Sequence, residues 1–284
     1  MEQVINYGKH YIDSSDVSAV LRTLKSKNIT QGSKIIEFEK KLSKKFGSKY
    51  CSVVSSGTAA LHLVGKVLKW KKDDIVLCSP ITFLATSNSI IYQGARPEFI
   101  DINLENYNID PNIIEKKLKS TKAKKIKAII ATDFAGHPCD WESLKYLSER
   151  YNVRLINDNC HSIGASYKNN LRYAQKYSDF VIHSYHAVKN ITTGEGGAIL
   201  TNNKSYKIKI DELKTHGVIK KKNRIFPWQY EMQDLGFNYR ITDIQASLGI
   251  SQLKKLDTFV AFRRNIANLY DKLLVDVNNC RTPH

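Results

Sequence analysis

Residues 180–200, FVIHSYHAVKNITTGEGGAIL, carry a lysine between two apolar runs. The run 180–182 indicates the end of one buried strand, and the run 198–200 indicates the start of another. The connecting segment contains Ser184, Lys189 and three glycines. Because loops held between buried strands often carry functional groups, this segment is the first candidate for a site.

Strand and helix patterns alternate on both sides of this segment, from about residue 49 to about residue 202. Apolar runs such as DIVLCSP (74–80) and IKAIIATDFAG (126–136) predict strands. The segment DPNIIEKKLKS predicts a helix, with Asp110 as its N-cap and Pro111 in its first turn. Regular alternation predicts an α/β fold with a mostly parallel central sheet and helices on both faces. Ligands of such sheets bind at the carboxyl ends of the strands.

The pattern changes after about residue 203. Residues 204–217 predict a helix, and residues 218–240 predict a long irregular loop. Residues 241–274 predict one long amphipathic helix, with a bend at Gly249. This helix is expected to lead into a second, smaller domain.

Composition narrows the class of protein. The chain has 284 residues, of which 42% are hydrophobic and 25% charged, as in soluble globular proteins. We find no run of roughly 18 apolar residues and no secretory signal, so we expect no membrane association and a cytoplasmic location. The five cysteines form no CxxC pair, which favours free, mostly buried thiols over a disulfide framework or a zinc knuckle.

The net charge of +17 comes from 44 basic and 27 acidic residues. One interpretation is nucleic-acid binding. The alternative is that the lysines cover solvated helix faces, as in KIIEFEKKLSKKFGSKY. The basic runs lack interleaved aromatic residues, so we favour the second interpretation and expect no nucleic-acid partner. Positive charge would still help to attract a phosphorylated small molecule.

The ends of two predicted strands carry candidate binding residues. Gly57 and Thr58 follow the strand at 50–55 and open a helix, where backbone N–H groups and a hydroxyl can bind an anion. The same residues could simply cap the helix. Phe83 follows Pro80 and could cover a flat ring, or it could belong to the core.

Two further strand ends carry titratable groups. Asp158 leaves a predicted central strand, where a carboxylate is costly unless it meets a cation or a strong donor. It could also be a helix cap or a solvated loop residue. His161 could be a hydrogen-bonded structural histidine or take part in chemistry. Lys189 lies in the glycine-rich segment, where burial would favour the neutral amine that acts as a nucleophile.

These four strand ends together meet the needs of pyridoxal 5'-phosphate (PLP). An anion site, an aromatic ring cover, a carboxylate for the pyridine nitrogen and a lysine for the aldehyde are what this cofactor requires. They follow one another along the chain in that order, from Gly57 to Lys189. The residues therefore suggest a PLP enzyme.

The sequence also resembles the DegT/DnrJ/StrS family of sugar aminotransferases. The resemblance covers nearly the whole chain and is carried by the following segments: ITQGSKIIEFEKKLSKKFG, SSGTAALHL, SPITFLATSNSIIYQGARPEFIDI, YNIDP, GHPCDWESL, NDNCHSIGASY, HSYHAVKNITTGEGGAILTN and LGFNYRITDIQASLGISQLKKLD. It implies the aspartate-aminotransferase-like fold of type I PLP enzymes.

The resemblance implies roles for individual residues. Lys189 matches the lysine that forms the Schiff base, and Asp158 matches the carboxylate that pairs with the pyridine nitrogen. His161 matches a position near the phenolic oxygen of the ring, and Phe83 matches the aromatic residue that stacks on it. The phosphate cradle is matched by Gly57, Thr58 and Ser184. Dehydratases of the family have histidine in place of the lysine, and Lys189 argues against that branch.

A further match implies an assembly. Asn238, in GFNYR, matches a residue that reaches the phosphate bound by the neighbouring subunit, which implies a homodimer with a shared active site. The segments GHPCDW, YHAVKNITTGEGG and PWQYEMQDLGFNYRITDIQ look most like the pseudaminic-acid branch of the family. That branch implies a UDP-linked 4-keto-6-deoxy-N-acetyl-hexosamine as substrate and L-glutamate as amino donor. Other amino-sugar branches share most of these motifs.

The resemblance also implies a domain organisation. Residues 1–25 would form an N-terminal arm and helix, and residues 26–230 the large PLP-binding domain. Residues 231–284 would form the long helix leading into a small domain that is apparently incomplete, because family members continue further. Two alternatives stay open: a non-catalytic binding protein with a PLP-enzyme fold, and a nucleic-acid binder.

Overall fold

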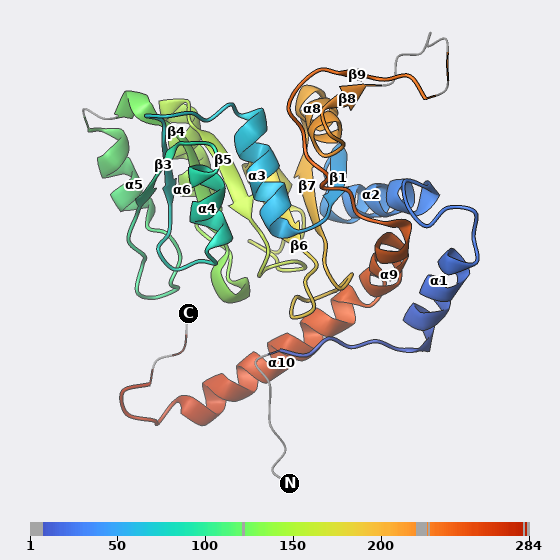
Figure 1. Cartoon of the computed structure of the whole chain (residues 1–284). Coiled ribbons are helices and arrows are strands. Elements are labelled where there is room, and N and C mark those ends of the chain that lie inside the picture. Colours follow the sequence, from blue (N-terminus) through green and yellow to red (C-terminus); the bar gives the residue numbers. More distant parts are fainter. Residues whose placement is uncertain (1–7, 121–122, 220–225, 227, 281, 283–284) are drawn as a thin grey trace.

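The computed structural model describes residues 8–120, 123–219, 226, 228–280 and 282. Its centre is a seven-stranded sheet in the order β1-β7-β6-β5-β4-β2-β3 (Figure 1). The strands are β1 (Tyr50–Val54), β2 (Ile75–Cys78), β3 (Arg96–Phe99), β4 (Ile126–Thr132), β5 (Arg154–Asp158), β6 (Phe180–Ser184) and β7 (Gly197–Thr201).

Strands β3, β2, β4, β5 and β6 are parallel, whereas β7 runs antiparallel to both β6 and β1. The prediction of a mostly parallel sheet is therefore confirmed. Strand β5 is the middle strand of the seven and ends at Asp158. The carboxyl ends of the parallel strands meet at one edge, and this is where their loops converge.

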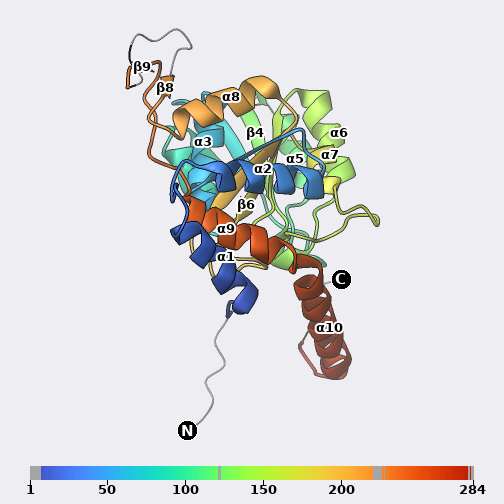
Figure 2. The same ribbon diagram turned by 90° about the vertical axis from the view of Figure 1, so that its right-hand side faces the viewer.

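Helices cover both faces of the sheet, as predicted (Figures 1 and 2). One face packs against α3 (Gly57–Val67), α4 (Ala85–Ile91) and α8 (Lys204–Leu213). The other face packs against α2 (Ser33–Phe46), α5 (Pro111–Leu118), α6 (Trp141–Tyr151), α7 (Tyr173–Tyr177) and α9 (Asp243–Leu253). The remaining helices are α1 (Ser14–Leu24), α10 (Leu256–Leu274) and the short 3-10 turns η1 (Ala123–Lys125) and η2 (Phe134–Gly136).

Burial on both faces explains the continuous apolar runs of the strands. In β4, Ile129 and Ala131 contribute to one core and Ala128 and Ile130 to the other. All four side chains are at most 1% exposed. A strand covered on both faces has no polar alternation, so polar residues are tolerated mainly where the strand ends.

Helix boundaries follow local capping, as the sequence indicates. Asp110 accepts a hydrogen bond from the Asn112 N–H at the start of α5, and Pro111 occupies the first turn. Asp140 caps α6 by accepting from the Ser143 N–H. Helix α2 ends at Phe46 and is capped by Gly47, whose φ of 73° lies in the left-handed region that favours glycine.

The prediction of one helix bent at Gly249 is wrong. Helix α9 ends at Leu253 and α10 begins at Leu256, so the break lies at Lys254 and Lys255. Gly249 is inside α9, where an added Cβ would come within 2.5 Å of the Phe38 ring of α2. The glycine allows the two helices to approach closely and does not bend the chain.

The prediction of an irregular loop over 218–240 is also partly wrong. Strands β8 (Val218–Ile219) and β9 (Glu231–Met232) pair antiparallel and project from the body of the molecule (Figure 2). Most residues between these two strands lie outside the described part of the chain, so the structure does not test the loop prediction for them.

Helix α10 extends away from the sheet (Figure 2). It has 19 residues, of which only Leu256 is fully buried. Phe262, Ile266 and Leu273 are all more than half exposed. Within the described residues, no helix combines the length and the apolar character needed to cross a membrane. The proposed domain boundaries stay a prediction, although α9 already contributes to one of the two cores.

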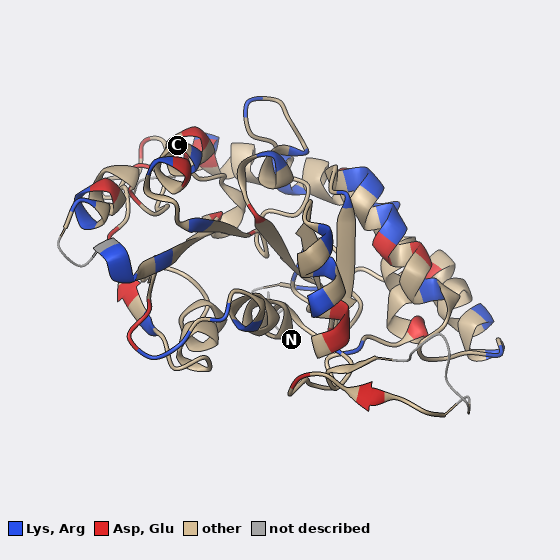
Figure 3. Ribbon diagram, turned by 90° about the horizontal axis from the view of Figure 1, so that it is seen from above, with Lys and Arg blue, Asp and Glu red and all other residues tan. Residues whose placement is uncertain are grey.

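Charged residues are mixed over the surface. Figure 3 shows Lys and Arg on many helices and loops, with Asp and Glu among them. Several form ion pairs along a helix, such as Lys41 with Glu37 and Lys119 with Glu115. This distribution supports the interpretation of solvated helix faces. The cysteines are free, as predicted, with Cys51, Cys78 and Cys139 buried.

We predict that Gly249→Ala destabilises the protein. Alanine gains about 1 kcal/mol of helix propensity over glycine, but its methyl group would displace the Phe38 ring. Overpacking of this kind costs about 1–3 kcal/mol in unfolding free energy, measured by urea denaturation. Thr258→Ala, at an exposed position of α10, is the control and should change the value by less than about 0.5 kcal/mol. Equal stability of both variants would contradict the role of Gly249.

Candidate active site

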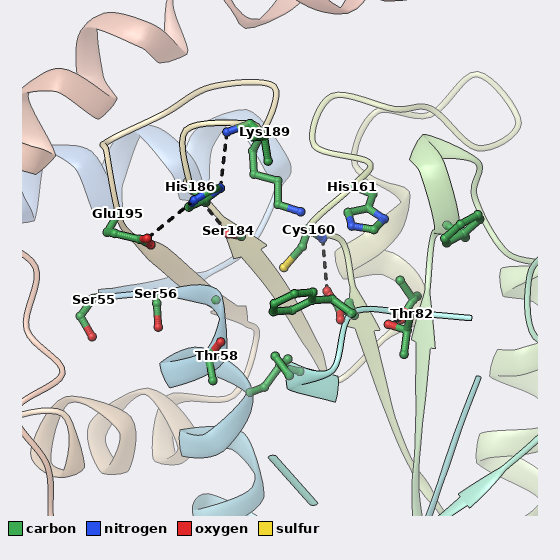
Figure 4. A pocket seen from close by; sticks show the side chains of 18 residues that line it. Ser55, Ser56, Thr58, Thr82, Cys160, His161, Ser184, His186, Lys189 and Glu195 are labelled. Atoms are coloured by element: carbon green, nitrogen blue, oxygen red, sulfur yellow. Dashed lines mark hydrogen bonds and ion pairs between the residues drawn. The ribbon is translucent and has the colours of Figure 1, made fainter. Parts of the chain in front are cut away.

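A cavity of about 750 Å³ lies at the carboxyl edge of the sheet (Figure 4). The start of α3, the segment before α4, the ends of β4, β5 and β6, and the loop before β7 form its walls. Its lining residues are Ser55, Ser56, Gly57, Thr58, Leu61, Thr82, Phe83, Ala85, Thr132, Phe134, Asp158, Cys160, His161, Ser184, His186, Val188, Lys189 and Glu195.

The cavity brings together seven of the eight residues that the sequence singles out. They are Gly57, Thr58, Phe83, Asp158, His161, Ser184 and Lys189. Asn238 does not line the cavity. It is exposed, between β9 and α9, and pairs with Thr215 in an isolated bridge.

Asp158 is a buried carboxylate with few partners. It is only 4% exposed, so it is not a solvated loop residue. One oxygen accepts a hydrogen bond from the Thr86 hydroxyl at 2.9 Å, and the other accepts from the Cys160 N–H at 3.3 Å. The Cys160 thiol also contacts the carboxylate, and among the described residues Asp158 forms no ion pair. A carboxylate can accept about four hydrogen bonds, so Asp158 retains capacity toward the cavity.

Asp133, one strand away, shows the opposite arrangement. It is fully buried, and burial raises the pKa of Asp133, against the effect of its hydrogen bonds. Its two oxygens accept from six donors: the Cys139 N–H, the Trp141 indole, the Asn157 and Asn159 amides, the Ser162 hydroxyl and the Tyr173 hydroxyl. A carboxylate saturated in this way has a structural role, because no acceptor site is left for a ligand.

The Lys189 amine is available for chemistry. The Lys189 N–H donates to the His186 carbonyl at 2.9 Å, which fixes the backbone of the loop. Figure 4 shows the side chain pointing into the cavity, toward Cys160 and His161. In the part of the chain that the structure describes, its amine makes no hydrogen bond or ion pair. A surface ion-pair role therefore does not describe this lysine.

His161 is held neutral by its surroundings. Burial is the main cause that lowers the pKa of His161, and the nearby positive charge of Lys189 lowers it further. The Asp158 carboxylate acts in the opposite direction. The ring contacts Phe134 edge-on at 6.0 Å between centroids, and no described residue forms a hydrogen bond with it. This is not the hydrogen-bonded structural histidine considered above.

The start of α3 provides an anion site. Ser56 caps the helix, accepting from the Ala59 N–H at 3.0 Å, so Gly57 and Thr58 are not the cap. The first N–H groups of a helix have no partners within it and can bind an anion. An added Cβ on Gly57 would come within 3.0 Å of the Ser184 side chain, which closes the site from the other side.

Close packing explains why a glycine stands at position 197 of the glycine-rich segment. An added Cβ on Gly197 would lie 2.5 Å from the Ser56 carbonyl carbon. Strand β7 can therefore begin directly beneath the start of α3 only with glycine at this position. This close approach places the loop that carries Lys189 beside the anion site.

Phe83 is 66% exposed, so its assignment to the core is wrong. It lies on the cavity wall next to Thr82. An exposed aromatic ring of this kind is available to cover a flat ligand.

Thr86, Thr132 and Cys160 were not singled out from the sequence. Thr86 follows Thr82 by four residues, a spacing that can bring two side chains together at the start of a helix. Thr132 ends the apolar run of β4, as Asp158 ends that of β5. These signals are weak, because serine and threonine are common at strand and helix ends.

The donor set fits a flat, phosphorylated heterocycle. An anion site lies at one end, a carboxylate with free acceptor capacity lies at a strand end, and an aromatic side chain lies on the wall. A free amine points into the same space. The chemistry of these groups is that required by PLP.

Comparison with known proteins identifies the family. The model of the DegT/DnrJ/EryC1/StrS aminotransferase family matches residues 10–284. The chain belongs to this family. Its α/β structure is accordingly that of type I PLP-dependent aminotransferases, and the predicted fold is confirmed.

Individual relatives are sugar aminotransferases. The chain is 41% identical over 272 residues to the UDP-4-amino-4,6-dideoxy-N-acetyl-beta-L-altrosamine transaminase of Campylobacter jejuni, covering 95% of this chain and 69% of that protein. It is 31% identical to the solved structure of Helicobacter pylori PseC, an aminotransferase involved in the biosynthesis of pseudoaminic acid, with a TM-score of 0.89. That match covers 97% of this chain and 72% of PseC.

A third relative is a solved structure whose title describes it as the PLP form. The PLP form of a Streptococcus pneumoniae protein named as a sugar aminotransferase, Spr1654, is 27% identical, with a TM-score of 0.86. The match covers 96% of this chain and 72% of that chain. The chain under study is thus an aminotransferase of the sugar-modifying type.

We predict that the two buried carboxylates respond differently to mutation. Asp133→Ala leaves six donors without their acceptor and should lower the unfolding free energy by more than about 3 kcal/mol. Asp158→Asn keeps an oxygen for Thr86 and should change the apoprotein by less than about 1 kcal/mol. Urea denaturation without cofactor measures both. A larger loss for Asp158→Asn would mean that Asp158 has a structural role.

Proposed function

We propose that this chain binds PLP and transfers an amino group from L-glutamate to C4 of a UDP-linked 4-keto-6-deoxy-N-acetyl-hexosamine. The observation that carries the proposal is the meeting of a free amine, Lys189, and an unsaturated buried carboxylate, Asp158, in one cavity. The choice of sugar rests on the 41% identity to a transaminase named for a UDP-linked amino sugar.

The residues have separate tasks in this proposal. PLP, when bound, supplies an aldehyde that reacts with amines and a ring that accepts electrons. Asp158 would accept a hydrogen bond from the ring nitrogen, and Phe83 would cover a face of the ring. Thr58, Ser184 and the first N–H groups of α3 would hold the phosphate.

Lys189 would hold the aldehyde carbon at rest and move a proton to and from the α-carbon of the amino donor. A lysine can carry this proton only when its amine is free of other partners, as it is in the described structure. His161, held neutral chiefly by burial, would donate a hydrogen bond near the phenolic oxygen without adding a positive charge. Glutamate would leave as 2-oxoglutarate, and the keto sugar would leave as the amine.

The proposal includes a homodimer that shares its active sites. Asn238 lies outside the cavity of its own chain, although the neighbouring Tyr239 carbonyl accepts from the Ser55 N–H at 2.9 Å. Ser55, Ser56 and Thr58 line both the main cavity and a second hollow of about 580 Å³ beside it. A second copy could approach the anion site from that hollow. Asn238 would act on the phosphate bound by this second copy.

Two alternatives are kept. Another nucleotide-sugar 3- or 4-aminotransferase would use the same cofactor residues with a different sugar. A non-catalytic protein with this fold would bind PLP or sugar without turnover. The first alternative predicts a different amino sugar as product, and the second predicts that no amino sugar is formed.

Reductive trapping tests the cofactor chemistry. We predict that PLP followed by borohydride attaches the cofactor to Lys189, because among the lysines that the structure describes only this one lines the cavity. Peptide mass spectrometry locates the adduct. Lys189→Ala should lose both the adduct and transamination, whereas Lys168→Ala, an exposed lysine paired with Glu142, should retain both. Normal turnover by Lys189→Ala would refute the assignment.

The identity of the amino sugar formed tests the proposed substrate. We predict that wild-type protein with PLP and glutamate converts the UDP-linked 4-keto-6-deoxy-N-acetyl-hexosamine and leaves dTDP- and GDP-linked keto sugars largely unchanged. NMR of the product should show nitrogen on C4. Amination at C3, or faster turnover of another nucleotide sugar, would favour the first alternative. Trapping at Lys189 without any amino sugar would favour the second.

A further inference from the structure

Three threonines form a chain of hydrogen bonds that ends on Asp158. The Thr86 hydroxyl donates to the Asp158 carboxylate at 2.9 Å. The Thr82 and Thr86 hydroxyl oxygens are 2.9 Å apart, and the Thr82 and Thr132 hydroxyl oxygens are 3.0 Å apart. Thr86, Thr132 and Asp158 are 0%, 3% and 4% exposed. The chain therefore lies out of contact with bulk water for most of its length.

Proton counting fixes the direction of the chain. Each hydroxyl has one proton to donate. Thr86 gives its proton to Asp158, so it can only accept from Thr82. Thr82 then has no proton left for Thr132 and must accept from it. While Asp158 is ionised, all three donors point toward the carboxylate, and hydrogen bonds aligned in this way strengthen one another.

Three different elements supply the chain. Thr86 is in α4, Thr132 ends β4, and Thr82 lies in the segment between β2 and α4. Asp158 ends β5, beside Thr132 in the parallel register. The chain therefore joins two strand ends to the start of a helix, and it fixes the direction of the carboxylate relative to all of them.

The segment that contains Thr82 and Thr86 also carries the aromatic ring cover, Phe83. Phe83 directly follows Thr82, and the Phe83 carbonyl accepts from the Thr86 N–H at 3.1 Å. The short segment 82–86 thus provides a donor to the carboxylate and the exposed ring on the cavity wall.

We propose that Thr86, supported by Thr82 and Thr132, is a positioning residue that keeps the Asp158 carboxylate aimed at the ring nitrogen of the cofactor. This inference rests on the proposed function, since it assigns Asp158 to that nitrogen. One Asp158 oxygen accepts from Thr86 and the other from the Cys160 N–H, and the carboxylate lines the cavity, where it can accept a further hydrogen bond. Thr86 itself does not line the cavity and acts only through Asp158.

Thr86→Val removes the hydroxyl while keeping the shape of the side chain. We predict that it weakens PLP binding to the apoprotein by about 10-fold or more, as expected for a lost hydrogen bond to a charged group. It should lower kcat and leave the KM for the sugar nearly unchanged. Thr86→Ser restores the hydroxyl and should recover most of both quantities. Ser87→Ala, at a half-buried neighbouring position whose hydroxyl donates only to the Leu84 carbonyl, is the matched control and should behave as wild type.

The protonation of the ring nitrogen provides a readout that a merely structural role would not move. PLP labelled with 15N in the ring, bound to each variant, reports this protonation by NMR. In wild-type protein the nitrogen should stay protonated up to alkaline pH. In Thr86→Val it should lose its proton at a lower pH, by about one unit for a tenfold weaker interaction. Thr86→Ser should return to the wild-type titration.

The outcomes separate this inference from the proposed function. If wild-type protein gives no adduct at Lys189, both the function and this inference fail. If wild-type protein is trapped normally and Thr86→Val retains wild-type affinity and the wild-type nitrogen titration, only this inference is overturned. If Thr86→Val does not fold, Thr82→Val decides, because it removes the links of Thr82 to Thr86 and Thr132 and leaves the hydrogen bond from Thr86 to Asp158 in place. In Thr82→Val, a downward shift of the ring-nitrogen titration that is smaller than one pH unit would support the proposed chain of threonines. An unchanged titration would overturn the inference.

Discussion

The site depends on the saturation of Asp133, the buried carboxylate at the end of β4. Its six donors come from β5, from the segment after β5, from the segment before α6, and from α6 and α7 on the same face of the sheet. Among them, Asn157 and Asn159 flank Asp158. Because successive side chains of a strand point to opposite faces, fixing these two asparagines on one face forces Asp158 to the other. The cavity lies on that face, beside α3 and α4.

The antiparallel strand β7 gives the site its lysine. A parallel successor to β6 would need a crossover, which would carry the chain to the opposite edge of the sheet. Strand β7 instead returns directly beside β6, so the loop between them stays at the carboxyl edge. Lys189 is thereby held over the end of the central strand, next to the groups contributed by the parallel strands. Gly197 makes this return possible because it clears the start of α3.

The sequence was informative where function is encoded by position along one strand. Asp158, Lys189 and Gly57 could be predicted because each follows an apolar run whose end must lie at one edge of the sheet. The contact of Thr86 with Asp158 could not, because it joins residues 72 apart and depends on how α4 docks. For the same reason the sequence predicts a bend at Gly249. The close contact of Gly249 with Phe38 involves another helix, α2, and cannot be recognised from the local sequence.

Counting donors separates the two buried carboxylates more clearly than burial does. Asp133 and Asp158 are both almost inaccessible to solvent and end neighbouring strands. A buried acceptor without partners is costly, so folding alone would favour saturation of both. The incomplete set of hydrogen-bond donors around Asp158 therefore reduces the stability of the fold. A hydrogen-bond donor on a bound ligand would offset this loss. Local incompleteness of this kind is what distinguishes a binding group from a structural one in a sheet buried on both faces.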